Sequence, residues 1–90
     1  MRTPIHTRQF EKDVKRMRKR GKDLQKLKSV LSSLIAEERL EARHQDHALV
    51  GTYKSRRECH VEPDWLLVYK LANDEIIFER TGTHSDLFES

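Results

Sequence analysis

The chain has 90 residues, of which 36% are hydrophobic and 37% are charged, and its formal net charge is +3. This length predicts a single domain over residues 1–90, and no apolar run approaches the roughly 20 residues needed to cross a bilayer. Residues 1–10 also lack the apolar core of a secretory signal. The single cysteine, Cys59, has no partner for an internal disulfide. We therefore expect a cytoplasmic protein without membrane association.

Positive charge is concentrated in the first third of the chain. Residues 1–30 contain 11 basic and 3 acidic side chains, a net charge of +8, whereas residues 31–90 contain 7 basic and 12 acidic side chains, a net charge of −5. A positive electrostatic field concentrated in this way favours a polyanionic partner, with nucleic acid as the first candidate. A solvated helix face is the alternative explanation, and charge alone does not decide between the two.

The N-terminal segment predicts a short edge strand followed by a helix. Residues 2–7 include Pro4 and Ile5, which fit an edge strand. From Thr7 onward, hydrophobic residues follow the i, i+4, i+7 spacing of one helical face, and these are Phe10, Val14 and Met17. Thr7 can cap this helix, and Gly21 is expected just past its C-terminus.

A second helix is predicted after Gly21, with Asp23 near its start. Its hydrophobic residues again share one face: Leu24, Leu27, Val30, Leu31, Leu34 and Ile35. Two helices joined through a glycine form an α-hairpin, and its apolar faces need another layer to cover them.

The hydrophobic period changes in the second half of the chain. Residues 57–62 alternate in the manner of a half-buried strand, and residues 65–71 form a near-continuous apolar run that is typical of a central strand. A weaker strand is predicted near residues 47–53.

A hairpin is predicted at the end of this region. Asn73 and Asp74 are turn residues, so residues 75–80 are expected to form a strand that closes the hairpin. The sequence therefore predicts an α+β fold, in which two N-terminal helices pack on one face of an antiparallel β-sheet.

Three histidines lie on or beside the predicted strands. His47 precedes one strand, His60 lies on the next, and His84 follows the last. If neighbouring strands pair, these imidazoles converge at one edge or face of the sheet. Arg80 on the last strand and Asp64 at the start of the central strand would join them there.

These residue types suit the cleavage of RNA. The 2′-hydroxyl of RNA is an internal nucleophile, so a base must accept its proton and an acid must protonate the departing 5′-oxygen. Imidazole is suited to both tasks because its pKa lies near neutrality. The guanidinium of Arg80 can stabilise charge on the phosphoryl oxygens, and an aromatic side chain such as Trp65 or Phe88 can hold an unstacked base.

Each of these residues also has a purely structural interpretation. A histidine is often a hydrogen-bonded structural residue. Asp64 can cap a turn, and Trp65 can belong to the core. Arg80 can pair with Glu79 or Glu62 on the surface of the sheet.

Zinc binding and cysteine catalysis are weaker alternatives. The motif His44-x-x-His47, together with Cys59 and His60, offers atoms that can bind zinc, but the chain has no C-x-x-C motif. Catalysis by Cys59 is disfavoured because His60 points to the opposite face of a strand. We therefore expect no metal and no cofactor, and we place His44 and His6 outside the site.

Several segments together carry a family resemblance. The motif H-V-E-P-D-W spans His60–Trp65, R-T-G-T-H spans Arg80–His84 ahead of Phe88, and H-A-L-V-G begins at His47. Weaker matches, F-x-x-D-x-K from Phe10 and D-x-x-K-L from Asp23, extend over the predicted helices. With these residues the chain resembles the YafQ-like toxins of the RelE superfamily over nearly its whole length.

The resemblance implies a microbial RNase-like fold and a type II toxin that cuts messenger RNA in the decoding site of the ribosome, without a metal. The catalytic positions of the family match His47, His60, Asp64, Arg80, His84 and Phe88. His84 is the first candidate for general acid or base, and which histidine is the acid remains open. Glu58 stands where relatives carry a different acidic residue, and Ala48 replaces a proline that is frequent in the family.

Contacts to RNA are expected from basic and aromatic side chains, namely Lys15, Arg16, Lys54, Arg57, Trp65 and Phe88. The resemblance also implies a small, partly disordered antitoxin of the DinJ or RelB kind, with operator DNA bound only through the toxin–antitoxin complex. The ribosome and messenger RNA are the other expected partners. The alternative function is a non-catalytic module that binds nucleic acid or antitoxin, or a degenerate toxin that acts in transcriptional repression.

Overall fold

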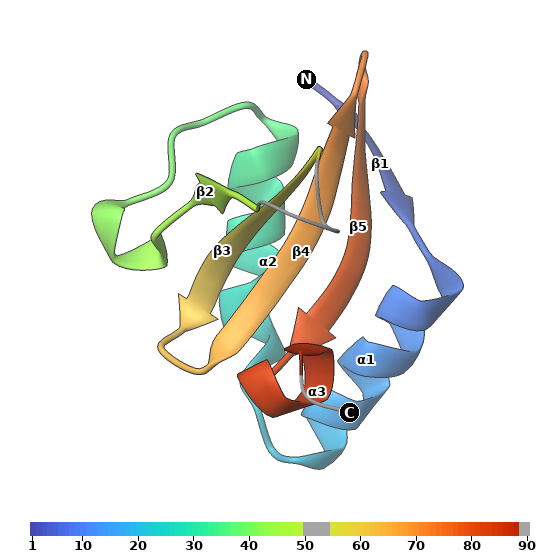
Figure 1. The fold of residues 1–90 in the computed structure, drawn as a ribbon, viewed down its shortest axis with the longest axis vertical. Helices are drawn as coiled ribbons and strands as arrows, with labels where there is room; N and C mark the ends of the chain where they lie inside the picture. The colour runs from blue at the N-terminus through green and yellow to red at the C-terminus, as the bar shows by residue number, and fades with distance from the viewer. Residues whose placement is uncertain (50–54, 89–90) are drawn as a thin grey trace.

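The computed structural model describes residues 1–49 and 55–88 (Figure 1). Its elements, in chain order, are β1 (Thr3–His6), α1 (Arg8–Lys19), α2 (Leu24–Ile35), the 3-10 helix η1 (Ala42–His44), β2 (His47–Ala48), β3 (Arg56–Glu62), β4 (Trp65–Ala72), β5 (Glu75–Gly82) and α3 (His84–Phe88). The strand predicted near residues 47–53 is represented by the short β2, and residues 50–54 lie outside the described part of the chain. No described helix is long and apolar enough to cross a membrane.

The ends of α1 and α2 follow from local chemistry. Oγ1 of Thr7 accepts a hydrogen bond from the backbone N–H of Phe10 (3.0 Å), and Oδ1 of Asp23 accepts one from that of Gln25 (3.0 Å), so both N-termini are capped. Gly21 follows α1 with a φ of +83°, a left-handed conformation that costs glycine little. The helical hairpin predicted from the sequence is therefore confirmed.

The strands form one mixed sheet in the order β1-β5-β4-β3-β2. Strands β2 to β5 pair in antiparallel fashion, but β1 pairs with β5 in parallel, with Thr3 opposite Glu75 and His6 opposite Phe78. The α+β fold is confirmed, and the prediction of a purely antiparallel sheet is corrected at this edge. No turn connects β1 to β5, because the two strands lie near opposite ends of the chain, and a local pattern therefore cannot specify their relative direction.

Alternation along β4 gives the sheet two different faces. Trp65, Leu67 and Tyr69 belong to the main core, which also contains residues of both helices: Phe10, Met17, Leu27, Val30 and Leu34. Leu66 and Val68 belong to a second cluster with Leu87 of α3. Figure 1 shows α2 behind the sheet and α3 in front of its lower end. The helical hairpin thus covers one face, and the short α3 covers only part of the other.

Candidate active site on the open face of the sheet

The face of the sheet that carries α3 also carries the polar side chains singled out from the sequence. Cys59 on β3 is buried in the main core, so its neighbours Glu58 and His60 point to the opposite face. The register places Glu58 beside Val68, and Val68 beside Arg80 on β5. Three adjacent strands therefore bring a carboxylate, an imidazole and a guanidinium into the same region.

His84 opens α3 and is held by the turn between β3 and β4. Its Nδ1 lies 2.6 Å from Oδ1 of Asp64, and the same oxygen accepts the backbone N–H of His84 at 3.1 Å. These hydrogen bonds lower the pKa of Asp64, so this carboxylate is ionised at neutral pH. Thr83 and Asp86 cap the helix reciprocally: the Thr83 N–H donates to Oδ2 of Asp86 (2.9 Å) and the Asp86 N–H donates to Oγ1 of Thr83 (3.2 Å).

The three imidazoles form a row in which Glu58 lies beside His47 and His60. The rings of His60 and His84 meet edge to face, with centroids 5.9 Å apart. Oε1 of Glu58 lies 3.6 Å from Nε2 of His60 and 3.8 Å from Nε2 of His47. The side chain of Glu58 is only 9% exposed, so its charge is poorly screened by water. The sequence-based expectation that His47, His60, His84 and Asp64 converge is confirmed by this geometry.

Arg80 pairs with a carboxylate that sequence reasoning did not single out. Its Nε lies 2.7 Å from Oδ2 of Asp13 on α1, and the side chain of Asp13 has no exposed surface. The predicted alternatives do not occur, because Glu79 pairs with Arg56 and Glu62 pairs with lysines of the helical hairpin. A signal was available: Asp13 occupies the hydrophobic face of α1 between Phe10 and Met17, where an unpaired charge would be costly.

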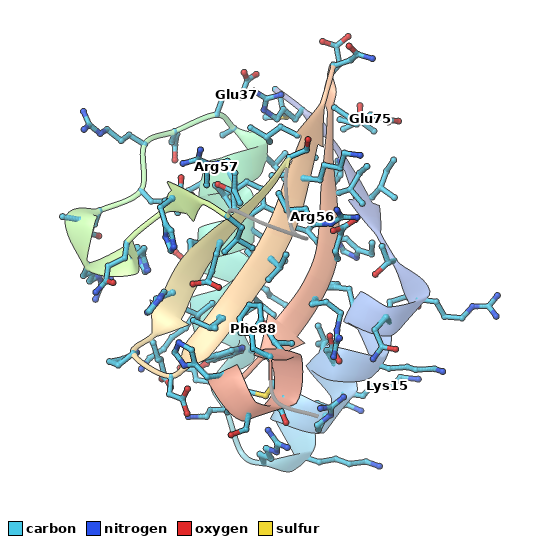
Figure 2. All side chains as sticks on the ribbon, viewed as in Figure 1. Lys15, Glu37, Arg56, Arg57, Glu75 and Phe88 are labelled. Carbon is cyan, nitrogen blue, oxygen red and sulfur yellow. The ribbon has the colours of Figure 1, made fainter. Side chains whose placement is uncertain are left out.

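The prediction that Trp65 stacks on RNA is wrong. The side chain is 0% exposed, within the main core, and its Nε1–H donates to Oγ1 of Thr81 at 2.9 Å. Its position at the start of β4 places it on the helix-covered face together with Leu67. Phe88 on α3 is 41% exposed and lies in front of the sheet (Figure 2), so this aromatic side chain presents part of its surface on the face of the histidines.

The basic residues proposed to contact RNA fall into different settings. Lys15 is exposed on α1 and points away from the sheet (Figure 2), whereas Arg16 forms ion pairs with Asp13 and Asp86. Arg57 donates to Asp46 and to the hydroxyl of Tyr69 and lies on the face opposite Glu58. The alternating strand directs it away from the histidines. Lys54 lies outside the described residues.

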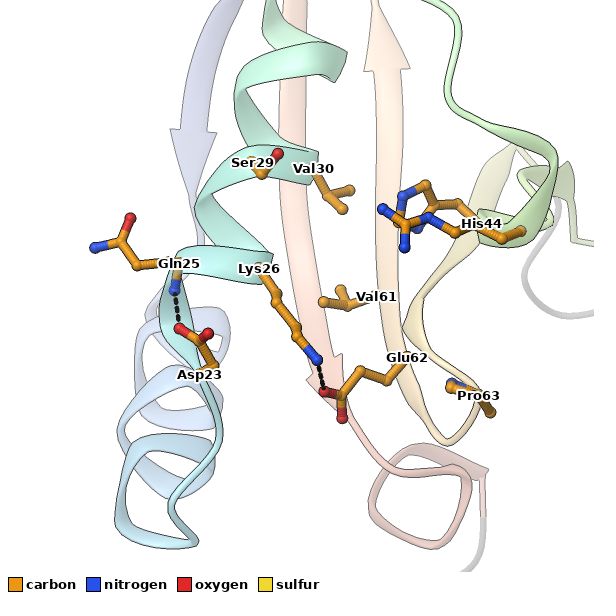
Figure 3. A pocket seen from close by; sticks show the side chains of 10 residues that line it. Asp23, Gln25, Lys26, Ser29, Val30, His44, Val61, Glu62 and Pro63 are labelled. Carbon is orange, nitrogen blue, oxygen red and sulfur yellow. Dashed lines mark hydrogen bonds and ion pairs between the residues drawn. The ribbon is translucent and has the colours of Figure 1, made fainter.

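A cavity elsewhere in the molecule does not contain this constellation. It has a volume of about 540 Å³ and lies between α2 and the end of β3 (Figure 3), lined by Asp23, Gln25, Lys26, Ser29, Val30, Arg43, His44, Val61, Glu62 and Pro63. Nζ of Lys26 and Oε2 of Glu62 are 2.8 Å apart across it. The row of histidines instead lies on an open surface, which suits a macromolecular substrate better than a small molecule.

The atoms named for the zinc and cysteine alternatives are not brought together. Nδ1 of His44 lies 2.6 Å from the carbonyl oxygen of His60, and Cys59 is buried on the other face of the sheet. Over residues 1–49 and 55–88, no group of three or more His, Cys, Asp and Glu side chains is placed to hold a metal ion. Burial raises the pKa of the Cys59 thiol to about 12, which suppresses its nucleophilic form.

Comparison with known proteins gives a consistent result. Residues 2–89 match the family model described as a bacterial toxin of type II toxin–antitoxin systems, YafQ. The chain is 51% identical over 81 residues to the mRNA interferase toxin YafQ of Escherichia coli (strain K12), which covers 89% of this chain and 88% of that protein. The crystal structure of YafQ from E. coli strain BL21(DE3) superposes with a TM-score of 0.93 at 46% identity, over 98% of this chain and 99% of that one. YafQ in a crystal structure of the E. coli DinJ–YafQ complex superposes with a TM-score of 0.91 at 47% identity, over the same shares of the two chains.

Proposed function

The chain belongs to the YafQ family of bacterial toxins from type II toxin–antitoxin systems, and from this premise we propose that it is an mRNA interferase. It acts as an endoribonuclease that stops translation by cutting messenger RNA on the ribosome. The observation that carries the proposal is the row of three imidazoles on an open face, with Asp64 beside His84 and Glu58 beside His47 and His60.

The reaction is a transfer within the RNA strand, and it needs no metal. A base removes the proton of a 2′-hydroxyl, and the 2′-oxygen attacks the adjacent phosphorus. The bond to the 5′-oxygen breaks, an acid protonates that oxygen, and the products are a 2′,3′-cyclic phosphate and a 5′-hydroxyl. Two imidazoles supply the base and the acid, because imidazole exchanges protons near neutral pH.

His84 and His60 are the pair best placed for these proton transfers. Asp64 engages Nδ1 of His84 at 2.6 Å and leaves Nε2 for the substrate, and the His84 side chain is 54% exposed. The ring of His60 is its neighbour at 5.9 Å. The carboxylate of Glu58 lies within 4 Å of both His60 and His47 and links the two rings. Arg80 stabilises the charge on the phosphoryl oxygens, and Phe88 stacks on an adjacent base.

The partners follow from the family. A relative has been crystallised as a DinJ–YafQ complex, and we extend this to a DinJ-like antitoxin for the present chain, with operator DNA bound through that complex. The ribosome and messenger RNA complete the set, and the site of action is the cytoplasm. An open catalytic face that depends on the ribosome to position its substrate fits these partners.

A second candidate is a non-catalytic nucleic-acid-binding module, and the exposed face of α1 favours it. Arg8, Lys12, Lys15 and Lys19 recur at i, i+4, i+7 and i+11 and are all exposed. None of the four forms an ion pair with another described residue. Such a stripe attracts phosphates whether or not the histidines act.

A purified translation system with a defined messenger separates the two candidates. Wild-type protein is expected to cut the messenger on ribosomes, and His84→Ala is expected to lower the rate by roughly 10²–10⁴-fold. His6→Gln is the matched control, because His6 is an exposed histidine packed on the rings of Phe10 and Phe78, outside the site. Full activity of His84→Ala would refute the site, and tight RNA binding without cleavage by wild type would establish the binding module.

A further inference from the structure

Charged side chains on one face of α1 connect Arg80 on β5 to the segment that carries His84. Asp13, Arg16 and Arg20 lie at i, i+3 and i+7, and a chain of ion pairs runs from Arg80 to Asp13, Arg16, Asp86 and Arg20. We propose that Asp13 is a positioning residue for RNA cleavage, because it fixes the guanidinium of Arg80 in the place where phosphoryl charge develops. The inference rests on the proposed function.

The contacts of Asp13 leave the Arg80 guanidinium little freedom. Oδ2 accepts from Arg80 Nε at 2.7 Å and from the backbone N–H of Thr81 at 3.1 Å. Oδ1 accepts from Arg80 Nη2 at 3.3 Å, from Arg16 Nη2 at 3.1 Å and from Gln9 Nε2 at 3.1 Å. The carboxylate has no exposed surface and all of its acceptor directions are used, so a two-point contact fixes the plane of the guanidinium.

Arg80 keeps the means to act on a substrate. A guanidinium has five N–H donors, and the contact with Asp13 uses those on Nε and Nη2. The remaining donors stay available, and the Arg80 side chain is one-third exposed. The charge is also preserved, because Arg16 offsets Asp13, so that the three side chains together carry a net charge of +1. A fixed donor array of this kind is what stabilises a transition state without reorganisation.

The same helix face holds the segment that carries His84. Nη1 of Arg16 lies 3.2 Å from Oδ1 of Asp86, and Arg20 donates to both oxygens of Asp86 at 2.6 and 3.0 Å. Asp86 is two residues from His84 and caps α3 through Thr83. Through α1, the guanidinium of Arg80 is therefore connected to the segment that positions the imidazole of His84.

A double-mutant cycle tests the proposal against a simple stabilising role. Single-turnover cleavage on ribosomes is measured for wild type, Asp13→Asn, Arg80→Ala and the double variant, and the rate constant at saturation is separated from the half-saturating concentration. We expect Asp13→Asn to lower the rate constant by roughly 10–100-fold at an unchanged half-saturating concentration. In the Arg80→Ala background the same change is expected to cost nothing further.

Glu79→Gln is the matched control. Glu79 precedes Arg80 on β5 and pairs with Arg56 of β3. The substitution breaks this carboxylate–guanidinium pair and should leave the rate constant unchanged. An equal loss from Asp13→Asn in both backgrounds overturns the proposal, since the effect would then not pass through Arg80. Wild-type cleavage by Asp13→Asn also overturns it. If Arg80→Ala itself cleaves at the wild-type rate, the role of Arg80 in the proposed function fails, and the inference fails with it.

A second measurement leaves Asp13 unchanged and covers the case in which Asp13→Asn does not fold. In Arg80→Ala, the carboxylate of Asp13 remains as a receptor for a free cation. Methylguanidinium should restore cleavage in a saturable manner, and methylammonium should not, because only a guanidinium makes the two-point contact. His84→Ala should gain nothing from either cation. Equal rescue by both cations, or rescue by neither, would contradict a positioning role for Asp13.

Discussion

The imidazole of His84 is anchored to Asp64, with 2.6 Å between Nδ1 and Oδ1, and the same oxygen accepts the backbone N–H of His84 at 3.1 Å. One carboxylate thus holds both the ring and the first peptide group of α3. The side chains are 54% and 67% exposed, and exposed ion pairs contribute little to stability. In the proposed mechanism this contact orients the ring and leaves Nε2 to accept the proton.

Asp64→Asn should lower activity without lowering stability. An amide cannot stabilise the imidazolium that forms when His84 accepts a proton, so we expect the single-turnover rate constant to fall by roughly 10²-fold or more. The free energy of unfolding, measured in urea, should stay unchanged, because the ion pair is exposed. Glu75→Gln, an exposed change at the start of β5 (Figure 2), is the control. A loss of stability that matches the loss of activity would contradict the orienting role.

Lys15→Gln should weaken binding to RNA and reduce its salt dependence. Lys15 belongs to the exposed stripe on α1 and forms no ion pair with another described residue. The slope of log K against log salt concentration should fall by roughly 0.7–0.9 for one lost phosphate contact. Lys28→Gln makes the same change in charge at an exposed position of α2 and is expected to leave the slope unchanged. Equal effects of the two substitutions would indicate a general influence of net charge.

Asp86→Asn should alter how stability depends on pH. Hydrogen bonds from Arg20, followed by those from Thr83, hold the pKa of Asp86 well below its usual range. A carboxylate with a lowered pKa stabilises the folded state above its unfolded pKa of about 3.9, and this contribution disappears as pH falls through the folded value. We expect Asp86→Asn to cost about 2 kcal/mol at pH 7 and progressively less as the pH falls below about 3.9. A constant difference between the two proteins from pH 7 to pH 2 would show that the ionised form is not what matters.

Trp65→Phe should damage the core and leave RNA affinity intact. The substitution removes the donor to Thr81 Oγ1, which itself donates to the carbonyl oxygen of Leu66 at 2.7 Å. We expect a loss of about 1–3 kcal/mol in the free energy of unfolding. In the wild-type protein, the fluorescence of this single tryptophan should resist quenching by acrylamide, both free and with RNA. Quenching or a shift on RNA binding would return Trp65 to the substrate-binding surface.

Much of the secondary structure was predictable because its causes are local. Thr7 and Gly21 define the ends of α1 through a side-chain cap and a left-handed residue. Alternation from Arg57 to Glu62 predicted which side chains share a face of β3, and it correctly placed Cys59 and His60 on opposite faces. Periodicity and capping act over a few residues, so sequence alone determined these elements and the α+β class.

The candidate site was only partly predictable, because its pairings join distant parts of the chain. The convergence of His47, His60 and His84 followed from strands that pair as neighbours. The partner of Arg80 could not be predicted in this way. It is Asp13 and not Glu79 or Glu62, because the pairing depends on how α1 packs beside β5.

The sequence by itself determined the helices, the hairpin strands, the polar face of β3 and the set of groups able to move protons. Tertiary structure decided the parallel pairing of β1, the burial of Trp65 and the ion pairs that Arg16 and Arg80 form. The physical reason is that hydrophobic periodicity selects a face for each element locally. The long-range packing of α1 and α3 against the sheet decides instead which charged side chains are buried together. A buried charge without a partner would cost too much free energy, so these side chains form ion pairs.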